Sequence, residues 1–240
     1  VLTAEVLKER GERCVDIVAD MLMNASFPRS EFNMEKKVII EEIKMTKDDL
    51  EESCYLGMYK SVFPKTWYRY HIAGTIKSVR SLKLEDVKDF YRRYYSPSNA
   101  SLCIASSFSH DEVRDIVERY FSSWSGGRVV LPDTRECPSA PARIIRHKKN
   151  IEQAHILYGF DIGGLDRHGQ AALSMINKRL GGGGNSILFR ELRDKRGYAY
   201  NVYSDMDLNG MIGMFYIYAA VSQENLSAAS ATIDRTVDEF

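Results

Sequence analysis

The chain has 240 residues, a length that allows one large domain or two small ones with buried cores. Its 33 basic residues balance its 33 acidic residues, so the net charge gives no indication of a nucleic-acid or membrane-surface partner. A hydrophobic content of 44% with 28% charged residues is typical of a globular protein, and no apolar run is long enough to span a bilayer.

The cysteines are widely spaced and form no Cys-x-x-Cys pair, which argues against a zinc site made of thiolates: Cys14, Cys54, Cys103 and Cys137. The apolar surroundings of Cys14 and Cys103 favour a reducing compartment, either the cytoplasm or an organelle matrix. Apolar residues already show helical spacing within the first turns of the sequence. We therefore expect that the chain begins inside a fold and is a fragment.

The first half of the sequence is predicted to be mostly helical. Apolar spacing indicates an amphipathic helix over residues 3–25, which Pro28 and its neighbours break. Ser30 is predicted to cap the next helix, which extends to about residue 53. The remaining elements are expected as helices at 55–63, 84–94 and 110–124, the last opened by a capping box from Ser109 to Glu112, and an apolar strand at 100–106.

A stretch rich in Gly and Pro, from about residue 125 to 141, has no periodicity and marks a domain boundary. We divide the chain into a first domain at 1–130, a linker at 131–142 and a second domain at 143–240. The second domain is expected to contain strands at 143–147, 153–160, 198–204 and 211–220, the last two turned by Asn209-Gly210, and helices at 167–180, 186–196 and from 224 onward. The fold class is thus α+β, with two related units, each a mixed β-sheet with helices packed on one face.

Two acidic side chains of the helix that begins near Ser30 fall on its apolar face. At about 100° per residue, Glu35 and Glu42 point into an arc that also carries Val38 and Ile43, whereas Glu41 lies on the polar face. A buried carboxylate costs several kcal/mol unless it is paired or bound to a metal. Either the two acids pair with Lys or Arg of another element, or Glu42 is a metal ligand with Glu35 behind it.

The histidines do not complete a metal site by their spacing. No two of the five lie three or four residues apart, and neither His-Glu-x-x-His nor His-x-x-Glu-His occurs. A structural role is the simpler explanation for all five, and His110 lies in the first turn of a predicted helix while His147 and His155 lie in strands that flank a turn. The glycine run at 181–184 lacks the ending of a P-loop and the strand that leads into a dinucleotide turn, so a close-packed, flexible helix junction fits better.

A basic helical run at 188–196 ends at Gly197 and is followed at once by a strand with Tyr198 and Tyr200. Cations near a helix C-terminus are favourable in themselves, which is the simpler explanation. The functional interpretation is that a guanidinium and a phenol converge beyond the helix end, as hydrogen-bond donors for a carbonyl oxygen.

Together these stretches resemble the pitrilysin-type (inverzincin) zinc metallopeptidases, whose members include mitochondrial processing peptidase and insulin-degrading enzyme. The stretch 32–43 is similar to the family's helix with two Glu seven residues apart. The stretch 74–99 follows a spacer pattern common in the family, and 188–200 resembles the motif whose Arg and Tyr face the substrate. In this order and spacing the motifs extend over nearly the whole chain.

The resemblance implies a LuxS/processing-peptidase-like architecture that is truncated at both ends in this chain. For the full-length protein it implies a homo- or heterodimer in which a water bound to Zn²⁺ hydrolyses peptides or unfolded proteins inside a chamber. Glu42 would be the third zinc ligand and Glu35 would steady it, while Arg193 and Tyr200 would bind the substrate. The family's His-x-x-Glu-His, which supplies the other ligands and the general base, does not occur in this sequence. We therefore expect the chain alone to hold no zinc and to be inactive.

Two alternatives remain open. The chain could belong to a non-catalytic paralogue or subunit that pairs with an active partner, as some members of the family do. It could also be a plain peptide-binding module that uses a sheet edge. An inward-facing Glu42 favours an active parent protein, because a site without metal gains nothing from a carboxylate there.

Overall fold

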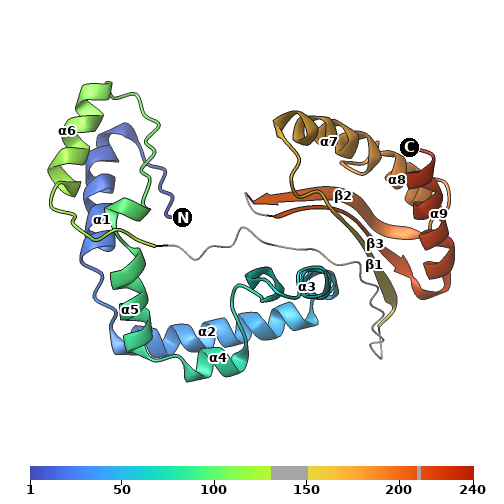
Figure 1. Cartoon of the computed structure of the whole chain (residues 1–240), viewed down its shortest axis with the longest axis horizontal. Coiled ribbons are helices and arrows are strands. Elements are labelled where there is room, and N and C mark those ends of the chain that lie inside the picture. The colour runs from blue at the N-terminus through green and yellow to red at the C-terminus, as the bar shows by residue number, and fades with distance from the viewer. Residues whose placement is uncertain (131–150, 210–211) are drawn as a thin grey trace. The chain divides into compact units, whose positions relative to one another are not determined.

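The structure, a computed structural model, describes residues 1–130, 151–209 and 212–240 (Figure 1). The described residues form two compact units. Unit 1 comprises residues 1–40 and the described part of 76–132, and unit 2 comprises 41–75 and the described part of 133–240. Residues 41–75 thus group with the C-terminal part of the chain. The predicted linker at 131–142 and strand at 143–147 lie outside the described residues, so that boundary stays a prediction.

Unit 1 is built from helices in its described residues. They are α1 (Gly11–Met23), the first part of α2 (Arg29–Asp48), α4 (Ile76–Ser81), α5 (Leu84–Tyr94) and α6 (His110–Phe121), with short 3-10 turns at Lys8–Arg10 and Pro97–Asn99. Polar side chains join them: Arg119 of α6 pairs with Glu12 of α1, and the Tyr91 hydroxyl of α5 donates to the Leu22 carbonyl at 2.6 Å. No helix within the described ranges is long and apolar enough to cross a membrane.

Of the helix starts predicted in unit 1, the capping box of α6 is confirmed and the starts of α1 and α2 were misplaced. The predicted capping box opens α6, since the Ser109 hydroxyl accepts from the Glu112 N–H at 3.3 Å and the Glu112 carboxylate accepts from the Ser109 N–H at 2.7 Å. The prediction of a helix over 3–25 was too long, because α1 begins only at Gly11. The cap predicted at Ser30 was also misplaced, since α2 starts at Arg29 and already contains it.

The strand expected at 100–106 does not form. These residues have no regular secondary structure, and Leu102 is half exposed. A strand needs a neighbouring strand to accept and donate its backbone hydrogen bonds. The described part of unit 1 contains no strand that could do so. Composition alone indicated the strand, whereas its formation depends on a partner.

Unit 2 contains a three-stranded sheet of β1 (Gln153–Asp161), β2 (Ala199–Asn209) and β3 (Ile212–Ser222), in the order β1-β3-β2. Both pairs are antiparallel, so the prediction of a mixed sheet was wrong for the described strands. The central strand β3 is buried along almost its whole length. The α+β class is confirmed.

The two faces of the sheet are covered by different helices. Alternate residues of β3, such as Phe215 and Ile217, pack with α7 (Arg167–Leu180), α8 (Ile187–Phe189) and α9 (Leu226–Asp238), which lie together on one side of the sheet (Figure 1). The intervening residues Ile212 and Met214 contact α3 (Leu50–Val62) on the other face. The prediction placed helices on one face only, because it did not assign residues 50–62 to this sheet.

An interruption of the helix at Asp49, between α2 and α3, allows this packing. A single helix was predicted to extend to about residue 53, but α2 ends at Asp48. The Asp49 carboxylate then caps α3 by accepting from the Glu52 N–H at 3.0 Å. The new helix direction brings Met58 and Phe63 into the small core with Met214.

Candidate functional site

The two acids predicted to face inward on α2 are exposed. Of the residues on this helix, only Ile43 is buried. Glu35 and Glu42 both lie in solvent, and Val38 beside them is 45% exposed. The predicted burial of both acids was therefore wrong. Neither acid forms an ion pair with another described residue, so the alternative of pairing with Lys or Arg was also wrong for the described residues. The helix forms as predicted, but no described element covers this face, so the helix phase assumed for Glu42 stays a prediction.

The described residues do not by themselves fit a zinc ion. Zinc sites in proteins use three or four ligands from His, Cys, Asp or Glu. Within residues 1–130, 151–209 and 212–240, no group of three such side chains lies close enough to hold a metal. A zinc bound through Glu42 would therefore need further ligands from outside the described part of the chain.

The second predicted site lies at the corner between α8 and β2. A π-helical turn, η4 (Arg190–Asp194), continues α8, with the Lys195 N–H bonded to the Arg190 carbonyl at 3.0 Å. Gly197 follows at φ +64°, a conformation that favours glycine, and its N–H donates to the Arg193 carbonyl at 2.9 Å. The sequence predicted a helix over this range that ends at Gly197, but not its π form.

The buried side of this turn fixes the direction of its exposed side. Leu188 and Leu192 are fully buried against the sheet and α9. The Tyr198 N–H bonds to the Leu192 carbonyl at 2.8 Å and ties the start of β2 to the same turn. Arg193 comes directly after Leu192 and projects into solvent.

A β-bulge turns Tyr200 toward Arg193. Ala199 pairs with Val221 and Asn201 with Ala220, so Tyr200 is the extra residue of β2. Ala199 is buried, whereas Tyr200 is 74% exposed. The Arg193 Nη1 donates to the Tyr200 carbonyl at 3.1 Å, and the guanidinium carbon lies 5.9 Å from the centre of the Tyr200 ring.

The structure thus brings Arg193 and Tyr200 together on one side of the corner. One guanidinium nitrogen holds the backbone of β2, and the other N–H groups and the Tyr200 hydroxyl remain available in the described structure. Guanidinium and phenol groups are both hydrogen-bond donors suited to a carbonyl or carboxylate oxygen. The geometry supports the predicted convergence, and the role of the pair in substrate binding stays a prediction.

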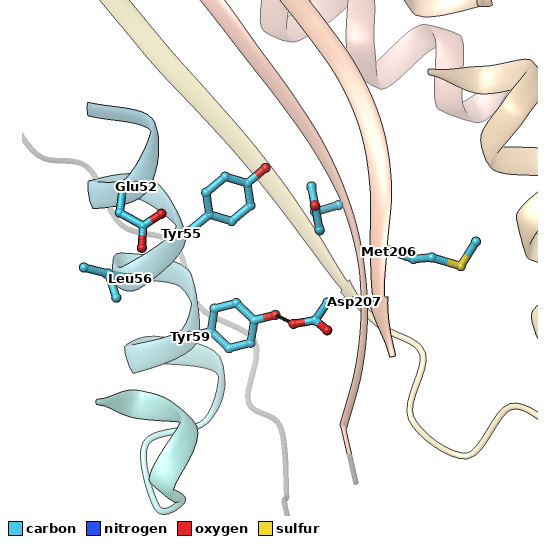
Figure 2. A pocket seen from close by; sticks show the side chains of 7 residues that line it. Glu52, Tyr55, Leu56, Tyr59, Met206 and Asp207 are labelled. Carbon is cyan, nitrogen blue, oxygen red and sulfur yellow. Dashed lines mark hydrogen bonds between the residues drawn. The ribbon is translucent and has the colours of Figure 1, made fainter. Parts of the chain in front are cut away.

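A pocket that sequence reasoning missed lies between α3 and β2 in unit 2. It has a volume of about 450 Å³ and combines two carboxylates with aromatic rings; it is lined by Glu52, Tyr55, Leu56, Tyr59, Met206, Asp207 and Tyr216 (Figure 2). The Tyr59 hydroxyl donates to the Asp207 carboxylate at 2.6 Å. Burial raises the pKa of Tyr59 above its usual value, and the hydrogen bond to Asp207 adds to the shift.

A sequence signal for this pocket did exist. Tyr55 and Tyr59 lie four residues apart on one helix face, and Asp205 and Asp207 share one face of a strand. The Tyr55 and Tyr203 hydroxyls are 2.9 Å apart, and Tyr203 also donates to the Glu51 carboxylate. The sequence alone does not show that the two patterns face each other, because the packing of α3 on β2 is set by the tertiary structure.

Comparisons with known proteins cover nearly the whole chain. Residues 1–76 match the family described as Insulinase (Peptidase family M16), and residues 81–240 match Peptidase M16 inactive domain. An uncharacterized zinc protease of Mycobacterium leprae is 33% identical over 90% of this chain and 49% of its own length. The uncharacterized zinc protease YmxG of Bacillus subtilis is 30% identical over 98% of this chain and 56% of its own length.

Solved structures share the fold. A peptidase M16 inactive domain from Pseudomonas fluorescens has a TM-score of 0.86 at 22% identity and covers 97% of this chain and 56% of its own. A protease from Helicobacter pylori has a TM-score of 0.85 at 20% identity over 95% of this chain and 57% of its own. The chain spans about half the length of the curated relatives it matches. The family matches extend over residues 1–76 and 81–240 and agree with the resemblance drawn from the motifs. The chain therefore belongs to the peptidase M16 family.

Proposed function

We propose that the full-length protein containing this chain is a zinc-dependent endopeptidase that hydrolyses peptides enclosed in a chamber. The relatives that cover most of this chain are named zinc proteases, which supports this assignment. The observation that carries it within the chain is the exposed Arg193–Tyr200 corner, where two donors from different elements meet. The substrate is a peptide or unfolded protein, and the active form is a homo- or heterodimer in a reducing compartment.

Glu42 is proposed as one zinc ligand and Glu35 as the acid that steadies it. Both carboxylates are exposed and without an ion pair to other described residues, so neither is already committed to a structural contact. The remaining ligands would come from outside the described residues. When bound, zinc would supply a polarised water for hydrolysis.

Arg193 and Tyr200 are proposed to hold the carbonyl oxygen of the peptide bond that is cleaved. As that oxygen gains negative charge, hydrogen bonds from a guanidinium and a phenol become stronger, which lowers the barrier. The π turn and the β-bulge fix the backbone that carries both donors, and the bond from Arg193 to the Tyr200 carbonyl restrains the guanidinium. Such preorganised donors cost little rearrangement during the reaction.

The experiment that tests this function uses the full-length protein and an unstructured peptide substrate. Arg193→Ala should lower kcat by about 100- to 1000-fold, the usual effect of removing one such donor, while the zinc content stays unchanged. Lys195→Ala is the matched control, because Lys195 is an exposed cation of the same turn that pairs with Glu191 instead. Equal kcat values for Arg193→Ala and the unmodified protein would contradict the proposed role of the corner.

A second candidate function is a non-catalytic subunit that pairs with an active partner. The description that matches residues 81–240, Peptidase M16 inactive domain, favours this candidate. The purified full-length protein separates the two. Stoichiometric zinc and cleavage without a partner support the endopeptidase, whereas cleavage only after addition of a partner subunit supports the non-catalytic one.

A further inference from the structure

Arg193 contacts a second aromatic ring besides Tyr200. Its guanidinium carbon lies 5.0 Å from the centre of the Phe189 ring, four residues earlier at the end of α8. This is closer than its 5.9 Å to the Tyr200 ring. Both distances are within the range of cation–π attraction.

Phe189 itself is anchored. Its side chain is partly buried and packs against the core of unit 2. The Phe189 N–H donates to the Ser186 hydroxyl at 3.3 Å, which fixes the start of α8. The ring therefore offers a fixed surface to an otherwise exposed and flexible side chain.

Three contacts restrain the guanidinium: the Phe189 ring, the Tyr200 ring and the Tyr200 carbonyl. An exposed arginine loses side-chain entropy when it is held in one conformation. Contacts that restrain it before binding remove part of that cost from the substrate complex. Of the three contacts, the Phe189 ring is the one supplied by a residue with no proposed role in substrate binding.

We propose that Phe189 is a positioning residue that acts on the substrate through Arg193. This inference rests on the proposed function of Arg193 and extends it to a residue that does not touch the substrate. The aromatic face is the feature that matters, because an aliphatic side chain of similar volume can fill the core but cannot attract the guanidinium by its π electrons.

The test compares Phe189→Leu and Phe189→Tyr in the full-length protein. Leucine keeps an apolar side chain in the core, whereas tyrosine keeps the ring. Phe189→Leu should lower kcat by about 3- to 10-fold, the effect of one partly exposed cation–π contact, with a smaller change in KM. Phe189→Tyr should stay within about twofold of the unmodified protein, and thermal unfolding should show that both variants fold.

A double-mutant cycle with Arg193→Ala separates positioning from a merely structural role. If Phe189 acts through the guanidinium, Phe189→Leu should change kcat by less than about twofold in the Arg193→Ala background, where no cation remains for the ring to attract. The same 3- to 10-fold loss in both backgrounds, or equal losses for Phe189→Leu and Phe189→Tyr, would overturn the inference.

The proposed function and this inference fail in different ways. Full activity of Arg193→Lys and of Arg193→Ala would remove the role of Arg193 and, with it, that of Phe189. A large loss for Arg193→Ala together with unchanged kcat for Phe189→Leu would leave the proposed function standing and overturn only the positioning role.

Discussion

The acidic face of α2 and the Arg193–Tyr200 corner were predicted by the same kind of reasoning, from residue spacing, yet the structure treats them differently. At the corner, neighbouring elements of unit 2 supply the contacts that orient the pair among the described residues. On α2, Glu35 and Glu42 are exposed, and no described residue pairs with them. A site closed by local contacts can be assessed within this chain, whereas a site on one helix face depends on what covers that face.

The largest expected effect concerns this 240-residue chain by itself. A single carboxylate with a second behind it does not hold zinc tightly against water, and the described residues offer no further ligand group. We predict no cleavage of an unstructured peptide and no stoichiometric zinc in the chelator-washed chain. Zinc bound at one equivalent with peptide cleavage would show that the chain carries a complete site.

The next prediction compares Glu42 with its neighbour in the full-length protein. Glu42→Gln should remove most of the zinc and the activity, because glutamine is a poor zinc ligand. Glu35→Gln should lower zinc affinity by about 10- to 100-fold, as expected for a residue that supports a ligand. Metal analysis after dialysis measures both.

Glu41→Gln is the matched control for this pair, since Glu41 already pairs with Lys44 at 2.7 Å on the exposed surface. It should leave zinc content and activity nearly unchanged. Equal zinc loss in the Glu41 and Glu42 variants would mean that the assumed helix phase is wrong, and the comparison with the corner would lose its basis.

A smaller effect is expected at the glycine run that supports β2. A Cβ atom on Gly181 would lie 2.3 Å from the Ser204 backbone nitrogen, so alanine cannot fit without moving the strand. Gly181→Ala should lower the free energy of unfolding by about 1–3 kcal/mol, the usual cost of overpacking. Chemical denaturation of this chain measures the change.

Gly184 provides the control from the same run. A Cβ atom there meets nothing within 4 Å, so Gly184→Ala should change the free energy of unfolding by no more than about 0.5 kcal/mol. Equal destabilisation by both substitutions would show that the close packing of this junction is not what fixes β2.

The smallest effect is a pH dependence at the corner. Hydrogen bonds from Lys195, at 2.5 Å, and Arg196, at 2.6 Å, lower the pKa of Glu191 to about 2 from its usual 4.5. Because the folded pKa is the lower one, the stabilisation is fully present above about pH 4.5 and is lost as the pH falls toward 2. Glu191→Gln should therefore destabilise the chain by less than about 1 kcal/mol at pH 7.

Urea unfolding at pH 7 and pH 3 checks this prediction. The difference between Glu191→Gln and the unmodified chain should be smaller at pH 3. A difference that is the same at both pH values would mean that the ion pairs of Glu191 do not contribute to the stability of the corner.

Much of the secondary structure could be predicted, because caps and periodicity are local. Helix α7 and the antiparallel pair of β2 and β3 formed as expected. Of the predicted turn Asn209-Gly210, Asn209 is the last residue of β2 and Gly210 lies outside the described ranges. The strand at 100–106 could not be judged from composition, since its backbone needs a partner strand. The interruption at Asp49 was not predicted, because the helical pattern of the sequence continues through it. In the structure, the Asp49 carboxylate caps a new helix at this point.

The candidate site was only partly predictable for the same reason. The meeting of Arg193 and Tyr200 followed from a helix end at Gly197 and a strand that starts directly after it. The bulge at Tyr200 could not be foreseen, because it is defined by the register of β2 against β3. The contact between Phe189 and Arg193 follows from helical spacing. Its proposed role in positioning Arg193 could not be predicted, because it depends on the Tyr200 ring beside the same guanidinium.

The most direct test of the central claim is kcat of Tyr200→Phe against Tyr198→Phe in the full-length protein. Tyr200 is exposed beside Arg193, whereas Tyr198 is partly buried and packs against the core, so loss of its hydroxyl is the matched control. Tyr200→Phe should lower kcat by about 100-fold or more with zinc retained, and Tyr198→Phe should keep nearly full activity. Full activity of Tyr200→Phe together with loss of activity in Tyr198→Phe would contradict the account.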